Sequence, residues 1–402
     1  MTERMQVVVF SEVKWRYMRT RKRFLLARFP ADWPILFLEP LNRTDPSHLR
    51  PLRDGRVTVA SLPVLKPKTT FPLVNALLGR QAVRSVLTAV VSRWVEHLLR
   101  AQAEPGLPRL FYLSNVLFLP VAERLPHAVL LYDANDDPLG FPGTPAWVAS
   151  YLERTLERAD VVVSCSAALA ARLGAHGARQ ITVIGNGAEL EHFMTPIDPA
   201  RVPAAIRATP RPRIGYAGAI AEWFDFDLIA ELAAAYPAAT LLLVGPVAAP
   251  VQAAAAALAR AHPNVVFAGR VAYEDLPHWV AHFDVALIPF KIGPATDVLN
   301  PNKLYEYLAA GLTVVSFAYS PDIEAFGTWV HLARSRAQFV RAVGEALAAP
   351  RDPAALRAIA MQHSWDARAA ALLALIAAER RSAHPAAPGT NGAAEEGHDG
   401  EG

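Results

Sequence analysis

Residues 283–311 read FDVALIPFKIGPATDVLNPNKLYEYLAAG and contain a strand, a polar loop and a helix in succession. Asp284–Pro289 is a short apolar run of the kind that forms a buried strand. Asn302–Ala310 is predicted to be a helix that begins beside Pro301 and stops at Gly311. Ligands of open parallel sheets bind where a strand leads into the N-terminus of a helix, so this stretch predicts both a fold class and a binding edge.

The same alternation extends through the rest of the chain. In the N-terminal half the expected strands are Gln6–Phe10, Ile35–Leu38, Val57–Ala60, Arg109–Leu113, Ala128–Tyr132, Val161–Ser164 and Ile181–Ile184. In the C-terminal half they are Arg213–Ala217, Ala239–Val244, Val265–Phe267, Asp284–Pro289 and Thr313–Phe317. The main expected helices are Asn75–Ala103, Pro145–Arg158, Ala167–Leu173, a helix capped by Asp225, Val251–Ala261, Tyr273–Ala281, Ser335–Ala348 and Trp365–Glu379. This order predicts an α/β protein with two facing Rossmann-like domains built on parallel sheets.

A cluster of prolines within residues 196–212 predicts a linker between the domains. The expected organisation is an N-terminal Rossmann-like domain at 1–195, the linker at 196–212, and a C-terminal Rossmann-like domain at 213–360. A last helix is expected at 361–380, and the low-complexity tail at 381–402 is expected to be disordered.

The bulk composition excludes several classes of protein. Of the 402 residues, 52% are apolar, which is enough for two buried cores. The net charge of +3 does not indicate a nucleic-acid partner. The single cysteine, Cys165, makes neither a disulfide framework nor a multi-thiolate metal site, and we expect it to be a small buried residue of a cytoplasmic protein. No apolar run reaches the roughly 20 residues that a membrane span needs, and no signal peptide is recognised.

Basic residues are concentrated near the N-terminus, where aromatic residues are interleaved with them. The group comprises Lys14, Arg16, Arg19, Arg21, Lys22, Arg23 and Arg28, with Trp15, Tyr17, Phe24 and Phe29 between them. Such a segment can bind an anionic acceptor or the inner face of the cell membrane. On an anionic membrane each basic residue contributes about 1 kcal/mol to the binding free energy. The structural alternative is an ordinary solvated helix face.

The loop and helix around residues 300–306 form the strongest candidate binding site. Lys303 and the exposed N–H groups of the helix start favour an anion such as a diphosphate. Glu306 lies one turn further on and can accept hydrogen bonds from two vicinal hydroxyls of a ribose. The alternative is a plain surface Lys–Glu pair three residues apart.

Three other loops follow predicted strands. Gly218 ends a strand and allows a phosphate to approach the backbone, although a tight turn explains it equally well. Asp133, Asp136 and Asp137 form an acidic loop that can act on an acceptor hydroxyl or bind a metal, or can simply be a helix cap and surface turn. Residues 185–189 follow the last predicted strand of the N-terminal half, and a turn explains them better than a catalytic role. The histidines show no metal-ligand spacing.

At these loops the sequence resembles the GT-B glycosyltransferases, especially the large group known as family four and its teichuronic-acid-type relatives. The stretches that carry the resemblance are 184–187, 214–225, 283–290 and 300–311. The resemblance implies a nucleotide-sugar donor on the C-terminal domain, no bound cofactor or metal ion, retention at the anomeric carbon, and a last helix from Trp365 that crosses back to the N-domain. The implied acceptor is a cell-envelope polysaccharide, a lipid-linked glycan or another glycan.

The candidate residues then divide into three sets. The donor-binding set is Gly218, Ala219, Glu222, Arg270, Pro289, Phe290, Asn300, Asn302, Lys303 and Glu306. The catalytic set is Asp133, Asp136, Lys303 and Glu306, and the acceptor or membrane set is Lys14, Arg16, Arg19 and Arg21. The resemblance implies that Glu306 contacts the donor ribose and that Lys303 lies near the diphosphate.

The sequence departs from the family at two places. A family Glu eight positions before Glu306 is replaced by Val298, with Asp297 beside it. Where the family often carries an Arg and a Lys after the Gly218 loop, Glu222, Trp223 and Asp225 stand here. Two further functions therefore remain open, a nucleotide-sugar epimerase and a catalytically silent subunit that scaffolds polysaccharide assembly.

Overall fold

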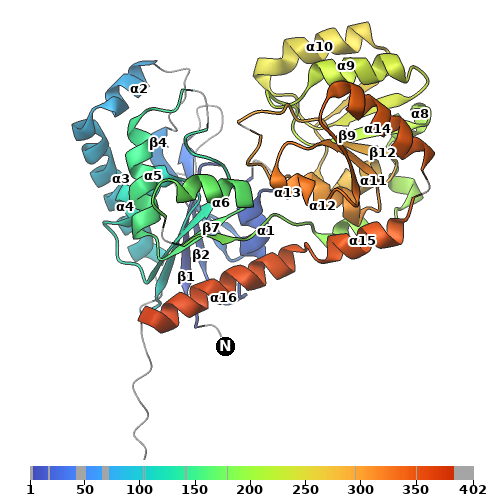
Figure 1. The fold of residues 1–402 in the computed structure, drawn as a ribbon. Helices are drawn as coiled ribbons and strands as arrows, with labels where there is room; N and C mark the ends of the chain where they lie inside the picture. The colour runs from blue at the N-terminus through green and yellow to red at the C-terminus, as the bar shows by residue number, and fades with distance from the viewer. Residues whose placement is uncertain are drawn as a thin grey trace, which may run out of the picture.

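The structure is a computed structural model, and it describes residues 3–383 apart from 17–18, 42–50, 66–71, 103, 105, 141–142, 179, 295 and 350. The described chain forms two α/β units that lie side by side, with the long helix α16 running beneath the first unit (Figure 1). Tyr17 and the predicted tail from residue 384 onward lie outside the described residues.

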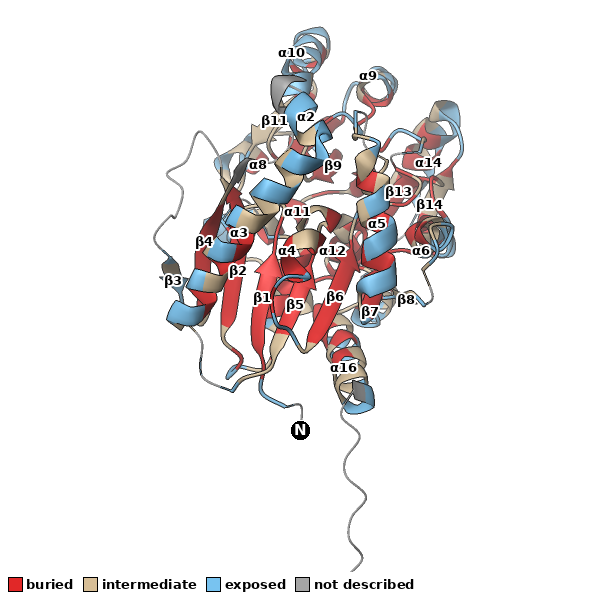
Figure 2. Cartoon of the chain, turned by 90° about the vertical axis from the view of Figure 1, so that its left-hand side faces the viewer, coloured by how far each residue is buried: buried red, intermediate tan, exposed pale blue. Residues whose placement is uncertain are grey.

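The first unit contains an eight-stranded sheet in the order β3-β4-β2-β1-β5-β6-β7-β8. Its strands are β1 (Gln6–Phe10), β2 (Ile35–Leu41), β3 (Leu52–Asp54), β4 (Val57–Leu65), β5 (Arg109–Leu113), β6 (Val129–Ala134), β7 (Val161–Ser164) and β8 (Thr182–Val183). All neighbouring strands pair in parallel except β3 with β4. The β-branched run of β1 is buried at every position because helices cover both faces of this sheet (Figure 2).

The helices of the first unit are α1 (Arg21–Ala27), α2 (Pro72–Gly79), α3 (Gln81–Gln102), α4 (Leu119–Ala122), α5 (Trp147–Arg158) and α6 (Ala167–Gly174). The single helix expected over Asn75–Ala103 is wrong, because the chain breaks after Gly79. Arg84 donates from Nη1 to the carbonyls of Leu78 (2.6 Å) and Gly79 (2.9 Å), and these bonds cap the end of α2.

The second unit contains a six-stranded parallel sheet in the order β11-β10-β9-β12-β13-β14. Its strands are β9 (Arg213–Ala217), β10 (Thr240–Val244), β11 (Val265–Gly269), β12 (Val285–Ile288), β13 (Val314–Phe317) and β14 (Val330–Ala333). Its helices are α9 (Phe226–Ala235), α10 (Gln252–Ala261), α11 (Leu276–Val280), α12 (Asn302–Ala309), α13 (Pro321–Glu324), α14 (Arg336–Ala348) and α15 (Pro353–Met361). Asp225 caps α9 by accepting from the Leu228 N–H (3.1 Å), and Gly311 ends α12 with a φ of 73°, both as predicted.

The segment between the sheets is not irregular throughout. It contains α7 (Leu190–Met194), a short 3₁₀ turn at Pro199–Arg201 and α8 (Ala204–Ala208). Ile206 of α8 is buried in the core of the second unit, so an apolar residue among the prolines anchors this crossing.

Helix α16 (Trp365–Ala383) packs against the first unit, although it follows the second unit in the chain. Trp365 is fully buried and stacks on Phe24 of α1, with ring centroids 5.0 Å apart. Leu372 and Ile376 belong to the same core cluster as β1 and β2. The predicted return of the chain to its first domain is therefore present.

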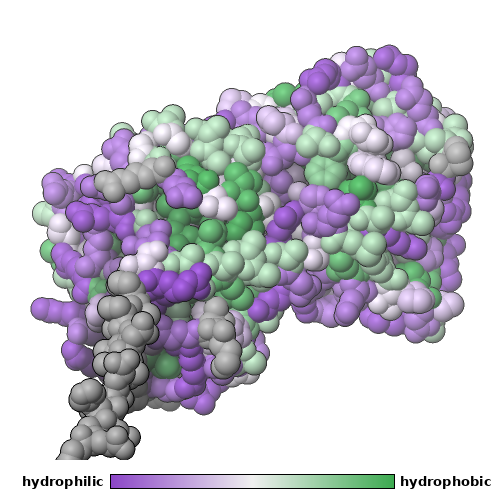
Figure 3. Space-filling model, turned by 60° about the horizontal axis from the view of Figure 1, so that its bottom comes forward, coloured by the Kyte–Doolittle hydropathy of each residue, from purple (hydrophilic) through white to green (hydrophobic). Residues whose placement is uncertain are grey.

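Within the described residues, no helix is both long enough and apolar enough to cross a bilayer. The face shown in Figure 3 is mixed, with a patch of hydrophobic residues on the first unit and hydrophilic residues around it. Cys165 is buried, and burial raises the pKa of its thiol to about 12, which confirms the prediction of a small buried residue.

Candidate active site

A cleft of about 1320 Å³ lies between the two units. Residues that follow the carboxyl ends of parallel strands in both sheets line it, which is where this fold class is expected to bind ligands. Its lining includes Arg16, Arg19, Arg21, Arg23, Asn135 and Asp136 from the first unit, and Gly218, Gly245, Arg270, Phe290, Lys303 and Glu306 from the second. Predicted residues that are far apart in the sequence are therefore brought into one cavity.

Two glycines let the backbone form part of the cleft wall. Gly218 follows β9 with a φ of 148°, and Gly245 follows β10 with a φ of 144°. A Cβ on Gly245 would lie 1.9 Å from the carbonyl oxygen of Gly218, so a side chain at this position would collide with the backbone. A Cβ on Gly218 would lie 3.0 Å from Cε of Lys303, which places the glycine turn directly against the Lys303 side chain.

The Lys303 ammonium lies among aromatic rings and has no carboxylate partner in the described part of the chain. Its Nζ atom is 4.6 Å from the ring centroid of Phe290 and 5.5 Å from that of Tyr216. Burial lowers the pKa of Lys303, while the nearby Glu306 opposes this shift. The positive charge is held in place by ring faces and is left available for an anion.

Glu306 lies on α12 one turn after Lys303 and is 8% exposed. Burial raises the pKa of this carboxyl, the Lys303 charge lowers it, and the Glu189 charge raises it further. No hydrogen bond from another described side chain reaches the carboxylate, so both of its oxygens can accept from a ligand. The helix itself starts at Pro301 without a side-chain cap, which leaves its first N–H groups without a side-chain acceptor.

The other predicted donor-binding residues fall into two groups. Ala219, Glu222, Arg270, Phe290, Asn300 and Asn302 line the cleft, whereas Pro289 is absent from its lining. The Pro289 carbonyl instead accepts from the Asp225 N–H (2.9 Å). Asn300 also joins the two units, because its Oδ1 accepts from the Asn186 N–H (3.2 Å) and from the Tyr305 hydroxyl (2.9 Å).

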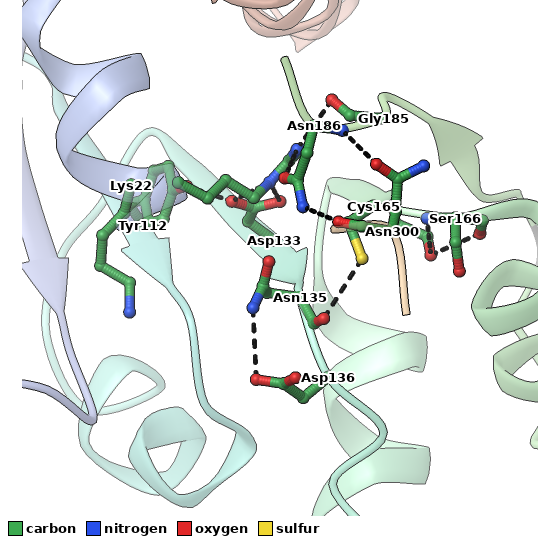
Figure 4. A network of polar contacts seen from close by, with 12 residues as sticks. Lys22, Tyr112, Asp133, Asn135, Asp136, Cys165, Ser166, Gly185, Asn186 and Asn300 are labelled. Atoms are coloured by element: carbon green, nitrogen blue, oxygen red, sulfur yellow. Dashed lines mark hydrogen bonds and ion pairs between the residues drawn. The ribbon is translucent and has the colours of Figure 1, made fainter. Parts of the chain in front are cut away.

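Asp133 does not lie in a loop, and its predicted role as a base that acts on the acceptor needs correction. Strand β6 continues through Asp133, which pairs with Val163 of β7. Its carboxylate is 2% exposed, and its two oxygens share the single Nε–H of Arg21 (3.0 and 3.1 Å). The Tyr112 hydroxyl also donates to it (Figure 4). A carboxylate held in this way outside the cleft lining has no access to an acceptor hydroxyl.

The two remaining carboxylates of the acidic loop differ in exposure to solvent. Asp136 is exposed and lines the cleft, and the side chain of Asn135 donates to it (3.2 Å). Asp137 is buried and accepts from Nη1 of Arg172 (3.0 Å). In the described residues no group of three or more His, Cys, Asp or Glu side chains is arranged to hold a metal ion.

The basic segment near the N-terminus faces the cleft. Arg16, Arg19, Arg21 and Arg23 all line it, whereas Lys14 is half-buried outside the lining. Arg21 was expected to contact an acceptor or a membrane, but it is 4% exposed and paired with Asp133, so it is unavailable to a membrane surface. Its Nη1 also donates to the Gly185 carbonyl and to Asn186 (both 3.0 Å), which fixes the turn after β8.

The site also uses residues that sequence patterns did not single out. Arg172 of α6 donates to both oxygens of Asp297 (2.8 and 2.9 Å), which links the two units. Arg19 pairs with Glu274 across the cleft (2.7 Å) and lies over the Tyr273 ring (4.9 Å). No local signal marks these pairs, because their members come from different units.

Val298, which replaces the family glutamate, is 3% exposed and packs in the core cluster of the first unit. Its carbonyl accepts from the Ser166 hydroxyl (2.7 Å). The neighbouring Asp297 is taken up by Arg172, so it does not supply the missing carboxylate.

Solved structures share this arrangement of two units over most of their length. Sucrose-phosphate synthase from Thermosynechococcus elongatus superimposes with a TM-score of 0.71 at 17% identity, covering 93% of this chain and 98% of that one. Anabaena HepE in complex with UDP and glucose gives a TM-score of 0.64 at 15% identity, covering 93% and 100%. The fold is GT-B, as the resemblance predicted.

Residues 211–358 match the family described as Glycosyl transferases group 1. TuaH of Bacillus subtilis (strain 168), named as a teichuronic acid biosynthesis glycosyltransferase, is 31% identical over 169 residues, which are 40% of this chain and 41% of that protein. The match thus spans less than half the length of this relative. The resemblance identified from the sequence is confirmed.

Proposed function

We propose that the protein is a glycosyltransferase that moves a sugar from a nucleotide-sugar donor to a glycan acceptor. The observation that carries this proposal is the pairing of Lys303 and Glu306 on α12 with the glycine turn at Gly218 in one cleft. An ammonium beside exposed backbone suits a diphosphate, and a buried carboxylate one turn away suits a ribose. The group 1 match and the UDP bound to HepE support a nucleotide-sugar donor.

In this proposal the charge that develops on the leaving diphosphate is stabilised by Lys303 and by the N–H groups at the start of α12. These groups are fixed before the reaction, so they need no reorganisation when the charge appears. We assign no metal ion or cofactor to the reaction, and retention at the anomeric carbon follows only from the family resemblance.

The acceptor hydroxyl would enter from the first unit. Asp136 is the candidate to orient or deprotonate it, because its carboxylate is exposed and lines the cleft. The name of TuaH favours an acceptor of cell-envelope polysaccharide synthesis, either a growing polysaccharide or a lipid-linked glycan.

The donor site is tested with a thermal-shift panel of UDP, GDP, ADP, CMP and dTDP on the wild type, on Glu306→Ala and on Glu345→Ala. Glu345 is an exposed glutamate on α14 outside the cleft, so its variant controls for the loss of one carboxylate. A nucleotide at 100 times its Kd stabilises the folded state by about 2.7 kcal/mol. One nucleotide should shift the wild type and Glu345→Ala but shift Glu306→Ala much less.

If no nucleotide shifts the wild type at millimolar concentration, the donor site is wrong and the protein is better explained as a scaffold subunit. If a nucleotide binds, the matching nucleotide sugar is incubated with the protein and no acceptor. A changed nucleotide sugar released under these conditions would indicate an epimerase instead of a transferase.

A further inference from the structure

The wall of the cleft that the first unit contributes carries an unusual density of guanidinium groups. Four of them come from one short segment, at Arg16, Arg19, Arg21 and Arg23. Two are neutralised, because Arg21 pairs with Asp133 (3.0 Å) and Arg19 with Glu274 (2.7 Å). Arg16 and Arg23 line the cleft and form no ion pair with another described residue, and the carboxylates of Asp54, Glu189 and Glu274 lie near enough to Arg23 to favour its charged form.

Arg23 is held in a single orientation by Trp15. Its Nη1 donates to the Trp15 carbonyl (2.9 Å), and its guanidinium lies 4.5 Å from the centroid of the indole ring. Trp15 is itself fixed, because its backbone N–H donates to Glu39 and its Nε1 to Asp54, both at 2.8 Å. The guanidinium is therefore positioned before any ligand arrives, which lowers the entropy cost of binding an anion.

Two carboxylates of the acidic loop, Asp136 and Asp137, lie on the same wall. Asp137 is taken up by Arg172 (3.0 Å), which leaves Asp136 as the exposed carboxylate of the acidic loop. Lys303 lies against Gly218 on the opposite unit. An anion bound by Arg16 and Arg23 would thus sit on the acceptor side of the cleft, and the donor diphosphate would sit on the other side.

We propose that Arg16 and Arg23 form an anion subsite for the acceptor, which carries a phosphate or a carboxylate group next to the hydroxyl that is glycosylated. The planar guanidinium fork binds both kinds of oxyanion with paired hydrogen bonds. This inference rests on the proposed function and narrows its acceptor to an anionic glycan or glycan phosphate.

The test uses the full chain saturated with the nucleotide that the thermal-shift panel identifies. Inorganic phosphate and, separately, glucuronate are titrated into the loaded protein by calorimetry. The Arg16→Gln/Arg23→Gln variant is compared with Arg80→Gln/Arg93→Gln, which removes two exposed arginines outside the cleft and so matches the change in charge. We expect the cleft variant to lose at least tenfold in affinity for one anion, while the control and the nucleotide affinity stay unchanged.

Three results would overturn the proposal. One is that neither anion binds the loaded wild type, and another is that the control loses as much affinity as the cleft variant. The third is that the cleft variant loses the nucleotide instead, which would assign the arginines to the donor diphosphate. If neither small anion binds, phosphatidylglycerol vesicles that bind in an Arg16- and Arg23-dependent way would assign these arginines to a membrane surface. If no nucleotide binds at all, the proposed function fails, and titration of phosphate into the free protein still tests the subsite.

Discussion

Lys303 and Glu306 lie one turn apart on α12, and burial shifts their pKa values in opposite directions. Burial raises the pKa of Glu306 and lowers that of Lys303, because each group loses solvation of its charged form. Ribose hydroxyls that donate to Glu306 would favour its ionised form, and a diphosphate beside Lys303 would favour the ammonium. Nucleotide binding is therefore linked to proton release at Glu306 and to proton uptake at Lys303.

Nucleotide affinity should consequently pass through a maximum with pH. As the pH rises through the raised pKa of Glu306, the carboxylate forms and affinity increases. As it rises further through the lowered pKa of Lys303, the ammonium is lost and affinity decreases. Calorimetry from about pH 5 to about pH 10 measures both limbs. In the Glu306→Gln variant the nucleotide phosphate still titrates, but the carboxyl at position 306 does not. The difference in pH dependence between this variant and the wild type on the acid side therefore measures the contribution of Glu306.

Arg21, which lines the cleft, forms a buried ion pair with Asp133. Arg21→Met would leave the Asp133 carboxylate buried and unpaired, at a cost of about 3–5 kcal/mol in the free energy of unfolding. Arg16→Gln removes an exposed arginine from the same segment and should change that free energy by about 0.5 kcal/mol or less. Urea unfolding of both variants measures the difference, and equal midpoints would contradict the structural role of the pair.

At the scale of elements, the turns after β9 and β10 shape the donor side of the cleft. The Gly218 N–H donates to the Val244 carbonyl, and the Gly245 N–H to the Gly269 carbonyl, both at 2.8 Å. Each strand end is thus tied to the next one, and the two glycine turns lie in direct contact. The turn geometry of one strand depends on its neighbour as well as on its own residues.

Gly245→Ala should disturb both turns, because the added Cβ would lie 1.9 Å from the Gly218 carbonyl oxygen. We expect a loss of about 1–3 kcal/mol in stability and a loss of nucleotide binding at Lys303. Gly174→Ala, at the end of α6, meets no atom within 4 Å and should stay within about 1 kcal/mol of the wild type with unchanged binding. Thermal unfolding with and without nucleotide measures both effects, and a Gly245→Ala protein that binds normally would contradict the tight contact.

At the scale of the whole molecule, a few side chains and one helix hold the two units together. Arg172 reaches Asp137 in the first unit and Asp297 in the second, and Asn300 joins Asn186. Helix α16 returns the chain to the first unit and packs on α1. These polar contacts lie between the two units, so they are suited to control how far the cleft closes.

Arg172→Gln should therefore widen the cleft without unfolding either unit. The expected cost in stability is small, about 0–1 kcal/mol, because the Arg172 side chain is 31% exposed. Small-angle X-ray scattering of the nucleotide-free protein should give a larger radius of gyration for this variant than for the wild type. Arg154→Gln is the matched control, because Arg154 pairs with Glu123 inside the first unit (2.6 Å). An unchanged radius for Arg172→Gln would show that other contacts set the closure.

The sequence by itself determined the alternation of strands and helices that predicts two Rossmann-like domains, and it singled out the candidate donor residues Gly218, Lys303 and Glu306, while the GT-B fold class was implied by the resemblance to a known family. These features depend on residues close together in the chain: apolar periodicity, the Asp225 cap, the Gly311 stop, and a glycine or a helix start after a strand. Local patterns of this kind carry enough information, because the backbone conformation they favour is set within a few residues.

Only the tertiary structure decided which charges remain available to a ligand. Arg21 meets Asp133 at a separation of 112 residues, and Arg172 meets Asp297 at a separation of 125. These pairings removed Asp133 from the candidate base position, and the packing of distant segments placed Arg16, Arg19, Arg21 and Arg23 in the lining of the cleft. The physical reason is that the partner of a charged side chain is set by how distant segments pack, and nothing in the local sequence specifies it.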